Sequence, residues 1–191
     1  MNPGSWGPET RDIFQEGLFI PPVKYYEKGK PNRDVIRMIL GNTRIPDYLY
    51  GDLEALAGAL RLGKRRITEL IQMYGVKTVI DAMNSILAEG ERRAKSRLAE
   101  LPKGKFYAED YLDEGYETKE PRRIFATTTI TDDEFIVDFT GAPKAFPVSL
   151  NTTYPATLAA VAVVYMAITD PHMPFNQGLL RPLKLIVPEN S

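Results

Sequence analysis

Two polar residues in one turn could take part in chemistry. The segment VDFTGAP, residues 137–143, carries Asp138 and Thr140 where a strand runs into a glycine turn, a common setting for polar groups at the mouth of a site. The alternative is that Thr140 and Gly141 only make the turn, while Asp138 accepts hydrogen bonds from the local backbone. We interpret Asp138 as a candidate catalytic residue and Thr140 as a candidate substrate-binding residue.

A second polar segment, SLNTTYPAT at residues 149–157, precedes a long apolar stretch. Asn151, Thr152 or Thr153 can cap a helix at this point. The N-terminus of a helix also favours an anion, so capping and binding can hold together. We take Asn151 as the second candidate catalytic residue.

A third loop, DPHMPFNQGLLRP at residues 170–182, contains three prolines and His172, the only histidine of the chain. A lone histidine is more often a loop or packing residue than a catalyst, although it titrates near neutrality. Arg181 could bind a carboxylate or phosphate, or bridge to a neighbouring acid. We interpret Asn176 and Arg181 as substrate-binding. Because the ends of core elements present polar groups with little freedom, we expect one cleft to hold Asp138, Asn151, Asn176 and Arg181.

The composition excludes several classes of function. The chain has no cysteine and one histidine, which excludes disulfides, thiol catalysis and soft-metal sites built by this chain alone. The net charge is −1, and the basic residues of the predicted helices alternate with glutamates, so we expect no nucleic-acid partner. The most apolar stretch, residues 158–168, is shorter than the roughly 20 residues of a membrane span. We expect a cytoplasmic protein with no membrane partner.

Helical periodicity dominates the first half of the chain. Residues 1–33 are rich in proline and glycine, and we expect an extended arm that packs poorly against the rest and is cut early by proteases. Asp34 can cap a short helix that ends near Gly41. Apolar residues spaced by three, four and seven then predict long helices over residues 46–74 and about 77–101. With Gly75 between them, these helices predict an antiparallel hairpin in the region 34–101.

The second half alternates in the manner of strands, at residues 106–116, 122–130, 134–139 and 183–187, with a tight turn at 131–133. Residues 153–169 predict a helix with little polar face and therefore full burial. The fold class is α+β: an irregular N-terminal arm, a long helical hairpin, and a mostly antiparallel sheet with one buried helix in the region 102–191. Because the chain starts within an arm and stops after a buried strand, we expect a fragment.

Six segments in consistent order resemble the hydantoinase B family. This family includes the B-type halves or subunits of 5-oxoprolinase, N-methylhydantoinase and the acetone and acetophenone carboxylases. The matching stretches include ITDDEFIVDFTGAP and NTTYPAT, and together they cover residues 4–30, 41–76, 91–114, 130–143, 151–157 and 170–190. The chain departs from the family at residues 146–151, where members often have Gly-Pro-x-Asn, and at residues 176–178, where Asn-Gln-Gly replaces Asn-Glu-Gly. The second departure removes a carboxylate.

The resemblance implies a function that this chain does not perform alone. It implies a fragment of the B-type subunit of an ATP-dependent hydrolase of lactams, hydantoins or 5-oxoproline. It also implies a hydantoinase A-type partner that uses ATP, and a divalent metal held by the remainder of the B-type subunit. Two alternatives remain open: a fragment of an ATP-dependent ketone carboxylase subunit, and a non-catalytic assembly module.

Overall fold

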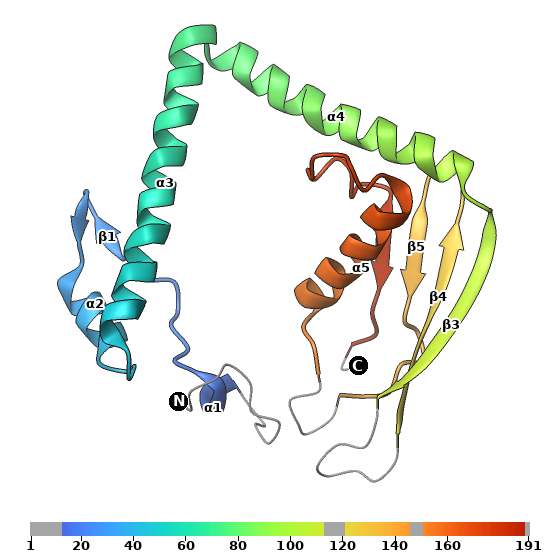
Figure 1. Ribbon diagram of the computed structural model, residues 1–191, viewed down its shortest axis with the longest axis horizontal. Helices are drawn as coiled ribbons and strands as arrows, with labels where there is room; N and C mark the ends of the chain where they lie inside the picture. Colours follow the sequence, from blue (N-terminus) through green and yellow to red (C-terminus); the bar gives the residue numbers. More distant parts are fainter. Residues whose placement is uncertain (1–12, 113–120, 146–150, 190–191) are drawn as a thin grey trace. The chain divides into compact units, whose positions relative to one another are not determined.

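The computed structural model describes residues 13–112, 121–145 and 151–189 of the 191-residue chain (Figure 1). The chain divides into two compact units, Met1–Val79 and Ile80–Ser191. Among the described helices, none combines the length and apolar character that crossing a bilayer requires. The predictions that concern residues 1–12, the end of the strand at 113–116 and the departure at 146–150 lie outside the described residues.

The first unit joins a small hairpin to two helices. Its elements are α1 (Ile13–Glu16), β1 (Tyr26–Glu27), β2 (Lys30–Pro31), α2 (Arg33–Leu40) and α3 (Pro46–Tyr74). The antiparallel strands β1 and β2 are joined by Lys28 and Gly29, both at positive φ, which is the backbone of a tight hairpin turn. The cap of α2 is Asn32, whose side chain accepts a hydrogen bond from the Val35 backbone N–H. The prediction that Asp34 caps this helix is therefore wrong by two residues.

A carboxylate on α3 holds the hairpin in place. Glu54 accepts hydrogen bonds from the hydroxyl of Tyr26 at 2.9 Å and from that of Tyr25 at 3.3 Å. Arg61 lies 3.8 Å from Glu54 and stacks 5.4 Å from the centre of the Tyr26 ring. Burial, followed by the contact with Glu54, raises the pKa of Tyr25 to about 12. The part of the arm around Tyr25 and Tyr26 thus packs on α3, contrary to the expectation that all of residues 1–33 pack poorly.

The two long helices form where the periodicity predicted them. Gly75 ends α3 with φ of 80°, and α4 (Val76–Glu100) begins at the next residue. A positive φ suits glycine because it lacks a Cβ atom. The boundary between the two units falls within α4, after Val79. The antiparallel packing of α3 against α4 stays a prediction.

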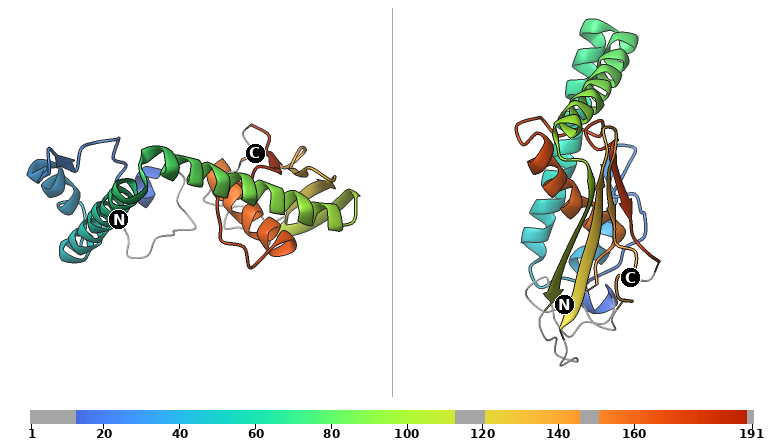
Figure 2. Two further views of the ribbon diagram at one scale, coloured as in Figure 1. Left: turned by 90° about the horizontal axis from the view of Figure 1, so that it is seen from above. Right: turned by 90° about the vertical axis from the view of Figure 1, so that its right-hand side faces the viewer.

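The second unit is built on a four-stranded sheet of order β3-β4-β5-β6 (Figure 2). Its strands are β3 (Gly104–Leu112), β4 (Arg122–Ile130), β5 (Phe135–Asp138) and β6 (Leu183–Ile186). The first three strands pair antiparallel, whereas β5 and β6 pair parallel. Thr131 makes the β4–β5 turn by accepting hydrogen bonds at its hydroxyl from the backbone N–H groups of Asp133 and Glu134. The α+β class with a mostly antiparallel sheet is confirmed.

The core of this unit joins α4, the sheet, α5 (Tyr154–Thr169) and the loop before β6. The Tyr165 ring of α5 meets the Phe135 ring of β5 edge-on, with centroids 5.3 Å apart. Tyr165 is fully buried, and burial raises its pKa to about 12. The buried members of the cluster are Ala94, Leu98, Phe135, Val137, Tyr165, Met173 and Leu179.

The helix α5 is only half covered in the described structure. Its inner side buries Ala162, Tyr165 and Thr169, but the side chains of Val163 and Val164 are 68% and 57% exposed. The predicted full burial is therefore wrong for this chain. A single sheet face contacts only one side of a helix, so an evenly apolar helix needs a second covering layer to be buried.

We expect the Glu54→Gln substitution to release the β1–β2 hairpin. A hydrogen bond to a charged acceptor contributes about 1.5–3 kcal/mol, and the amide loses that charge while keeping the shape. Trypsin should then cut after Lys28 several-fold faster than in the unsubstituted chain, as followed by mass spectrometry. Glu69→Gln is the matched control, because Glu69 also lies on α3 but pairs with exposed arginines of the same helix. Equal cutting of the two variants would contradict the assigned role of Glu54.

Candidate functional site

The turn after β5 binds Asp138 to its own loop. Asp138 ends β5 between Thr127 of β4 and Ile186 of β6, and its Oδ1 accepts a hydrogen bond from the Thr140 backbone N–H at 2.8 Å. Hydrogen bonding by the side chain and then the backbone of Thr140 lowers the pKa of Asp138 below its usual value. Asp138 is therefore ionised at neutral pH and accepts, rather than donates, hydrogen bonds.

Gly141 gives this turn its shape. Its φ is 92°, and a Cβ atom built there would lie 3.0 Å from the Phe125 ring. Thr140 beside it is exposed. The local alternative for the segment VDFTGAP is thus realised, with Asp138 bonded to the turn. It does not exclude a site here, because the carboxylate still lies at the end of the sheet where β5 stops.

A pocket of about 150 Å³ lies beside this turn. The loop after β5 forms one wall, and Asn151 and Thr152 form another. Asn151 is not the cap of α5: the N-cap is Thr153, which makes no side-chain capping bond. The candidate catalytic residues Asp138 and Asn151 therefore lie at the same end of the sheet. The lining residues are Leu112, Arg122, Ile124, Phe139, Ala142, Pro143, Lys144, Ala145, Asn151, Thr152, Thr157 and Val187.

The loop that carries Asn176 is seated on α4 with almost no space between the backbones. Asn176 Oδ1 accepts hydrogen bonds from the backbone N–H groups of Gly178 at 2.9 Å and Leu179 at 3.3 Å. A Cβ atom at Gly178 would lie 1.9 Å from the carbonyl oxygen of Leu87, and one at Gly90 would lie 2.5 Å from Asn176 Oδ1. Both glycines are therefore required for this contact. Asn176 shapes the loop.

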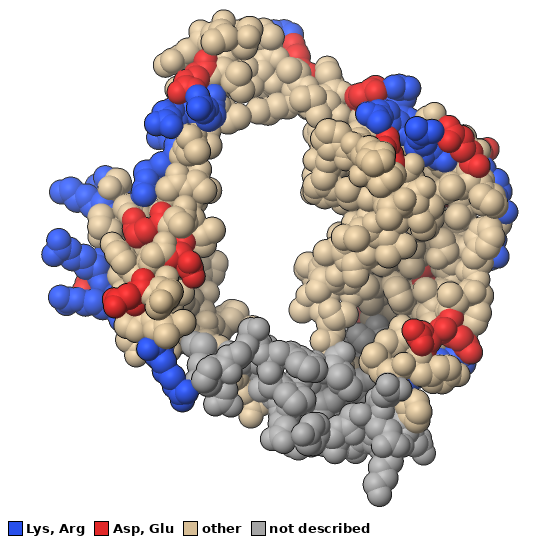
Figure 3. All heavy atoms as spheres, in the orientation of Figure 1, with Lys and Arg blue, Asp and Glu red and all other residues tan. Residues whose placement is uncertain are grey.

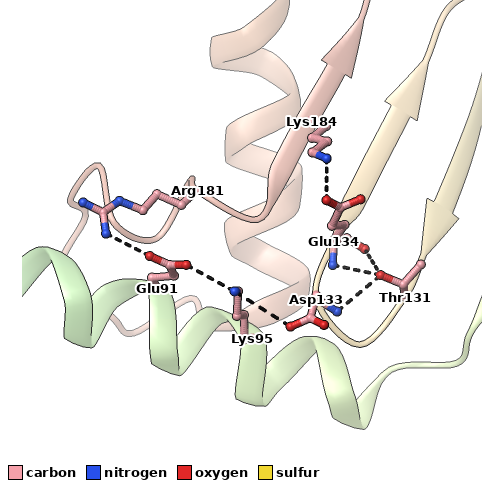
Figure 4. Close-up of polar contacts among 7 residues, drawn as sticks. All are labelled: Glu91, Lys95, Thr131, Asp133, Glu134, Arg181 and Lys184. Atoms are coloured by element: carbon pink, nitrogen blue, oxygen red, sulfur yellow. Dashed lines mark hydrogen bonds and ion pairs between the residues drawn. The ribbon is translucent and has the colours of Figure 1, made fainter.

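Arg181 belongs to a chain of ion pairs at the same place (Figure 4). Its Nη1 lies 2.8 Å from Glu91 Oε2, and the Lys95 Nζ lies 3.2 Å from Glu91 Oε1 and 3.8 Å from Asp133 Oδ1. Hydrogen bonds from Arg181 and Lys95 lower the pKa of Glu91. The pairs join the loop before β6 to α4 and to the β4–β5 turn. Arg181 thus bridges to a neighbouring acid, which was the alternative to anion binding.

The predicted common cleft is wrong for this chain. The strands β5 and β6 are parallel, with Phe135 opposite Leu183 and Asp138 opposite Ile186. Arg181 precedes the start of β6, whereas Asp138 lies at the end of β5. Three residue steps along a strand span about 10 Å, so the two groups occupy opposite ends of the sheet. Asp138, Thr140 and Asn151 share one end, while Asn176 and Arg181 share the other.

Sequence reasoning missed an ion pair between the half-exposed Arg93 of α4 and the buried Asp170 of the loop after α5. Arg93 Nη2 lies 2.5 Å from Asp170 Oδ2, and the Asp170 side chain is 8% exposed. Burial raises the pKa of Asp170, but the hydrogen bond from Arg93 and further contacts outweigh it, so the pKa is lowered overall. Gly90, three residues earlier, signals close packing on α4, since a glycine within a helix often marks such packing, but its neighbour is Asn176 and not Asp170.

No group of three His, Cys, Asp or Glu side chains arranged to hold a metal ion occurs within the part of the chain that the structure describes. Lys, Arg, Asp and Glu side chains gather together over the C-terminal half of α4 (Figure 3). The i,i+3 pairs Arg92–Glu89 and Arg97–Glu100 account for much of this pattern. A mixture of both charges is typical of a solvated helix face.

The model of the hydantoinase B/oxoprolinase family matches residues 1–191. The chain belongs to this family. It is 30% identical to a putative B-type subunit of a D-/L-hydantoinase from Pseudomonas sp. strain NS671, with 99% of this chain and 34% of that protein covered. The same identity relates it to the caprolactamase beta subunit of Pseudomonas jessenii, covering 94% of this chain and 31% of the relative. The chain therefore spans about a third of these relatives.

Two solved structures share the fold. The ATP-dependent caprolactamase of Pseudomonas jessenii superimposes with a TM-score of 0.90 at 30% identity, covering 98% of this chain and 32% of that chain. An ATP-dependent acetone carboxylase superimposes with a TM-score of 0.85 at 16% identity, covering 95% of this chain and 26% of that chain. The second likeness concerns the fold alone. The resemblance drawn from the sequence is confirmed at the level of the family.

We expect Gly178→Ala to destabilise the chain by at least about 3 kcal/mol, because overpacking costs about 1–3 kcal/mol when side chains can adjust and here the clash is with backbone. Gly63→Ala is the matched control: nothing lies within 4 Å of a Cβ at that helical position, and the change should stabilise α3 by about 0.5–1 kcal/mol. Urea unfolding of both variants measures the difference. A Gly178→Ala protein as stable as the unsubstituted chain would contradict the close contact with α4.

Proposed function

We propose that this chain forms part of the B-type subunit of an ATP-dependent enzyme that hydrolyses cyclic amides, such as lactams, hydantoins or 5-oxoproline. The remainder of a B-type subunit and an A-type subunit complete the enzyme. The observation that carries the proposal is the match at 30% identity, over 99% and 94% of this chain, to a putative B-type hydantoinase subunit and to a caprolactamase beta subunit. The TM-score of 0.90 against the caprolactamase supports the same conclusion.

The chemistry of a cyclic amide explains why such an enzyme consumes ATP. An amide oxygen is a poor leaving group, whereas phosphate is a good one, so phosphorylation by the A-type subunit activates the ring for hydrolysis. Any divalent metal is held by the remainder of the B-type subunit. This chain contributes one wall of the site and the scaffold behind it.

Within that wall, we assign contact with the substrate to the turn after β5 and the pocket beside it. The carboxylate of Asp138 has a lowered pKa, so it stays ionised and acts as a hydrogen-bond acceptor that orients a water molecule, not as an acid. Asn151 lines the neighbouring pocket, and its amide is suited to bind the carbonyl or the product carboxylate. Thr140 is exposed beside Asp138 and offers a hydroxyl to the substrate. Asn176 and Arg181 have structural roles at the opposite end.

A chimeric enzyme tests the proposal. The segment of the caprolactamase beta subunit that matches this chain is replaced by residues 1–191 and produced together with the partner subunit of that enzyme. We expect hydrolysis of caprolactam, hydantoin or 5-oxoproline that requires both ATP and the partner subunit, measured by product chromatography together with phosphate release. The isolated chain should hydrolyse none of them. A folded, assembled chimera that turns over no cyclic amide would contradict the proposal and favour an assembly module.

In an active chimera, we expect Asp138→Asn to lower kcat by about 100-fold, because it removes the charge that orients the water molecule, and loss of one preorganised group costs about 10²–10³-fold. The amide keeps the shape of the side chain and its bond to the Thr140 backbone N–H, so the melting temperature should change by no more than about 2 °C. The matched control is Asp133→Asn, at the other end of β5, where the carboxylate is exposed and 3.8 Å from Lys95. Equal kcat values for the two variants would contradict the assignment of Asp138 to the site.

A further inference from the structure

An apolar groove lies between α5 and the half of the sheet formed by β3 and β4. Its volume is about 450 Å³, and it opens to solvent. The right-hand view of Figure 2 shows α5 on one face of the sheet with these two strands beside it. Thr128 supplies the only polar side chain among the lining residues, which are Phe106, Thr128, Ile130, Phe135, Val137, Ala160, Val161, Val164 and Ile168.

The strand register places one row of the lining on a single face of the sheet. Phe106 pairs with Thr128, and Thr128 pairs with Val137, so these three side chains point the same way. The packing of α5 is against β6 and β5, through Tyr165 and Phe135. The portion of the row on β3 stays open, and Phe106 is 45% exposed.

The space left open has the width of one helix. Neighbouring strands lie about 4.8 Å apart and a helix is about 10 Å across, so one helix covers about two strands. A four-stranded sheet therefore needs two helices on a covered face. The helix α5 supplies one of them, next to β5 and β6, and the groove marks the place of the second.

The composition of α5 also indicates that another segment covers the side of the helix that lines the groove. The helix contains no charged residue, and Figure 3 shows a continuous uncharged surface over it. Val164 and Ile168, one turn apart, are 57% and 47% exposed and line the groove. Exposed apolar surfaces of this kind mark interaction sites. A small-molecule site would need several polar groups to orient its ligand, and the lining offers one.

We propose that this groove receives one helix with an apolar face, supplied by the part of a hydantoinase B-type subunit outside the segment that this chain matches. About two thirds of the B-type hydantoinase subunit and of the caprolactamase beta subunit lie outside that segment, which is ample chain for such a helix. The inference rests on the proposed function, since the occupant is the remainder of that subunit. It does not depend on catalysis, and its test needs no turnover.

Thiol labelling tests the occupant. Because the chain contains no cysteine, Val164→Cys places a single thiol in the groove, and Ser96→Cys places one on the exposed side of α4 as the matched control. Each variant is labelled with a thiol reagent in the isolated chain and in the caprolactamase chimera. Peptide mass spectrometry reads the modification at that position alone. We expect the labelling rate at position 164 to fall at least about tenfold in the chimera, with no such change at position 96.

The same labelling measurement distinguishes this helix from other occupants of the groove. Equal labelling at position 164 in the chain and in a folded chimera would overturn the proposal. Protection in the isolated chain that grows with protein concentration would also overturn it, because a second copy would then fill the groove. A chimera that protects position 164 yet hydrolyses no cyclic amide would support the groove while contradicting the proposed function.

Dye binding to the isolated chain gives a second measurement that needs no chimera. An open apolar groove should bind anilinonaphthalene sulfonate, a dye that reports exposed apolar surface. We expect Val164→Lys to lower the dye fluorescence several-fold. Val163→Lys is the matched control, since Val163 is 68% exposed on the same helix but does not line the groove. A folded chain without dye binding, or equal losses in both variants, would show that the groove is not open and would overturn the proposal.

Discussion

The contact between the loop before β6 and α4 determines the arrangement of the second unit. Gly178 lies against the Leu87 carbonyl with no room for a Cβ atom, and the Asn176 side chain rests on Gly90. Backbone atoms of the two segments meet there, so neither segment has room to move toward the other. The loop enters β6 from the α4 end of the sheet as a result. That entry makes β6 parallel to β5.

Parallel pairing then decides which polar groups meet. The loop that precedes β6 lies beside the start of β5, and the turn that follows β5 lies at the opposite end of the sheet. The polar residues of the loop 170–182 therefore meet α4, where Arg181 pairs with Glu91 and Asp170 with Arg93. The turn after β5 and Asn151 lie at the other end of the sheet, where they border the pocket. The polar groups at the α4 end of the sheet serve packing, and the other end carries Asp138 and Thr140.

The helix α5 is covered on one side only in the described structure. Its inner side packs on the sheet through Tyr165, while Val163 and Val164 are exposed. The hydantoinase and caprolactamase subunits with which this chain aligns are about three times as long. An apolar helix is stable within a large subunit because a second layer covers its outer side.

Local patterns in the sequence determined the long elements of this protein, although they did not predict the β1–β2 hairpin within the arm. Alternation predicted β4 and β5, periodicity predicted α3 and α4, and Gly75 marked the end of α3, because these depend on neighbours a few residues away. The family was also accessible, since its segments recur in order. The pairing partner of β6 and the position of Arg181 were not, because they depend on Leu87 and Gly90, about 90 residues earlier in the chain. The separation of the predicted site into two ends was decided by tertiary structure alone, since strand direction follows from where a distant loop can pack.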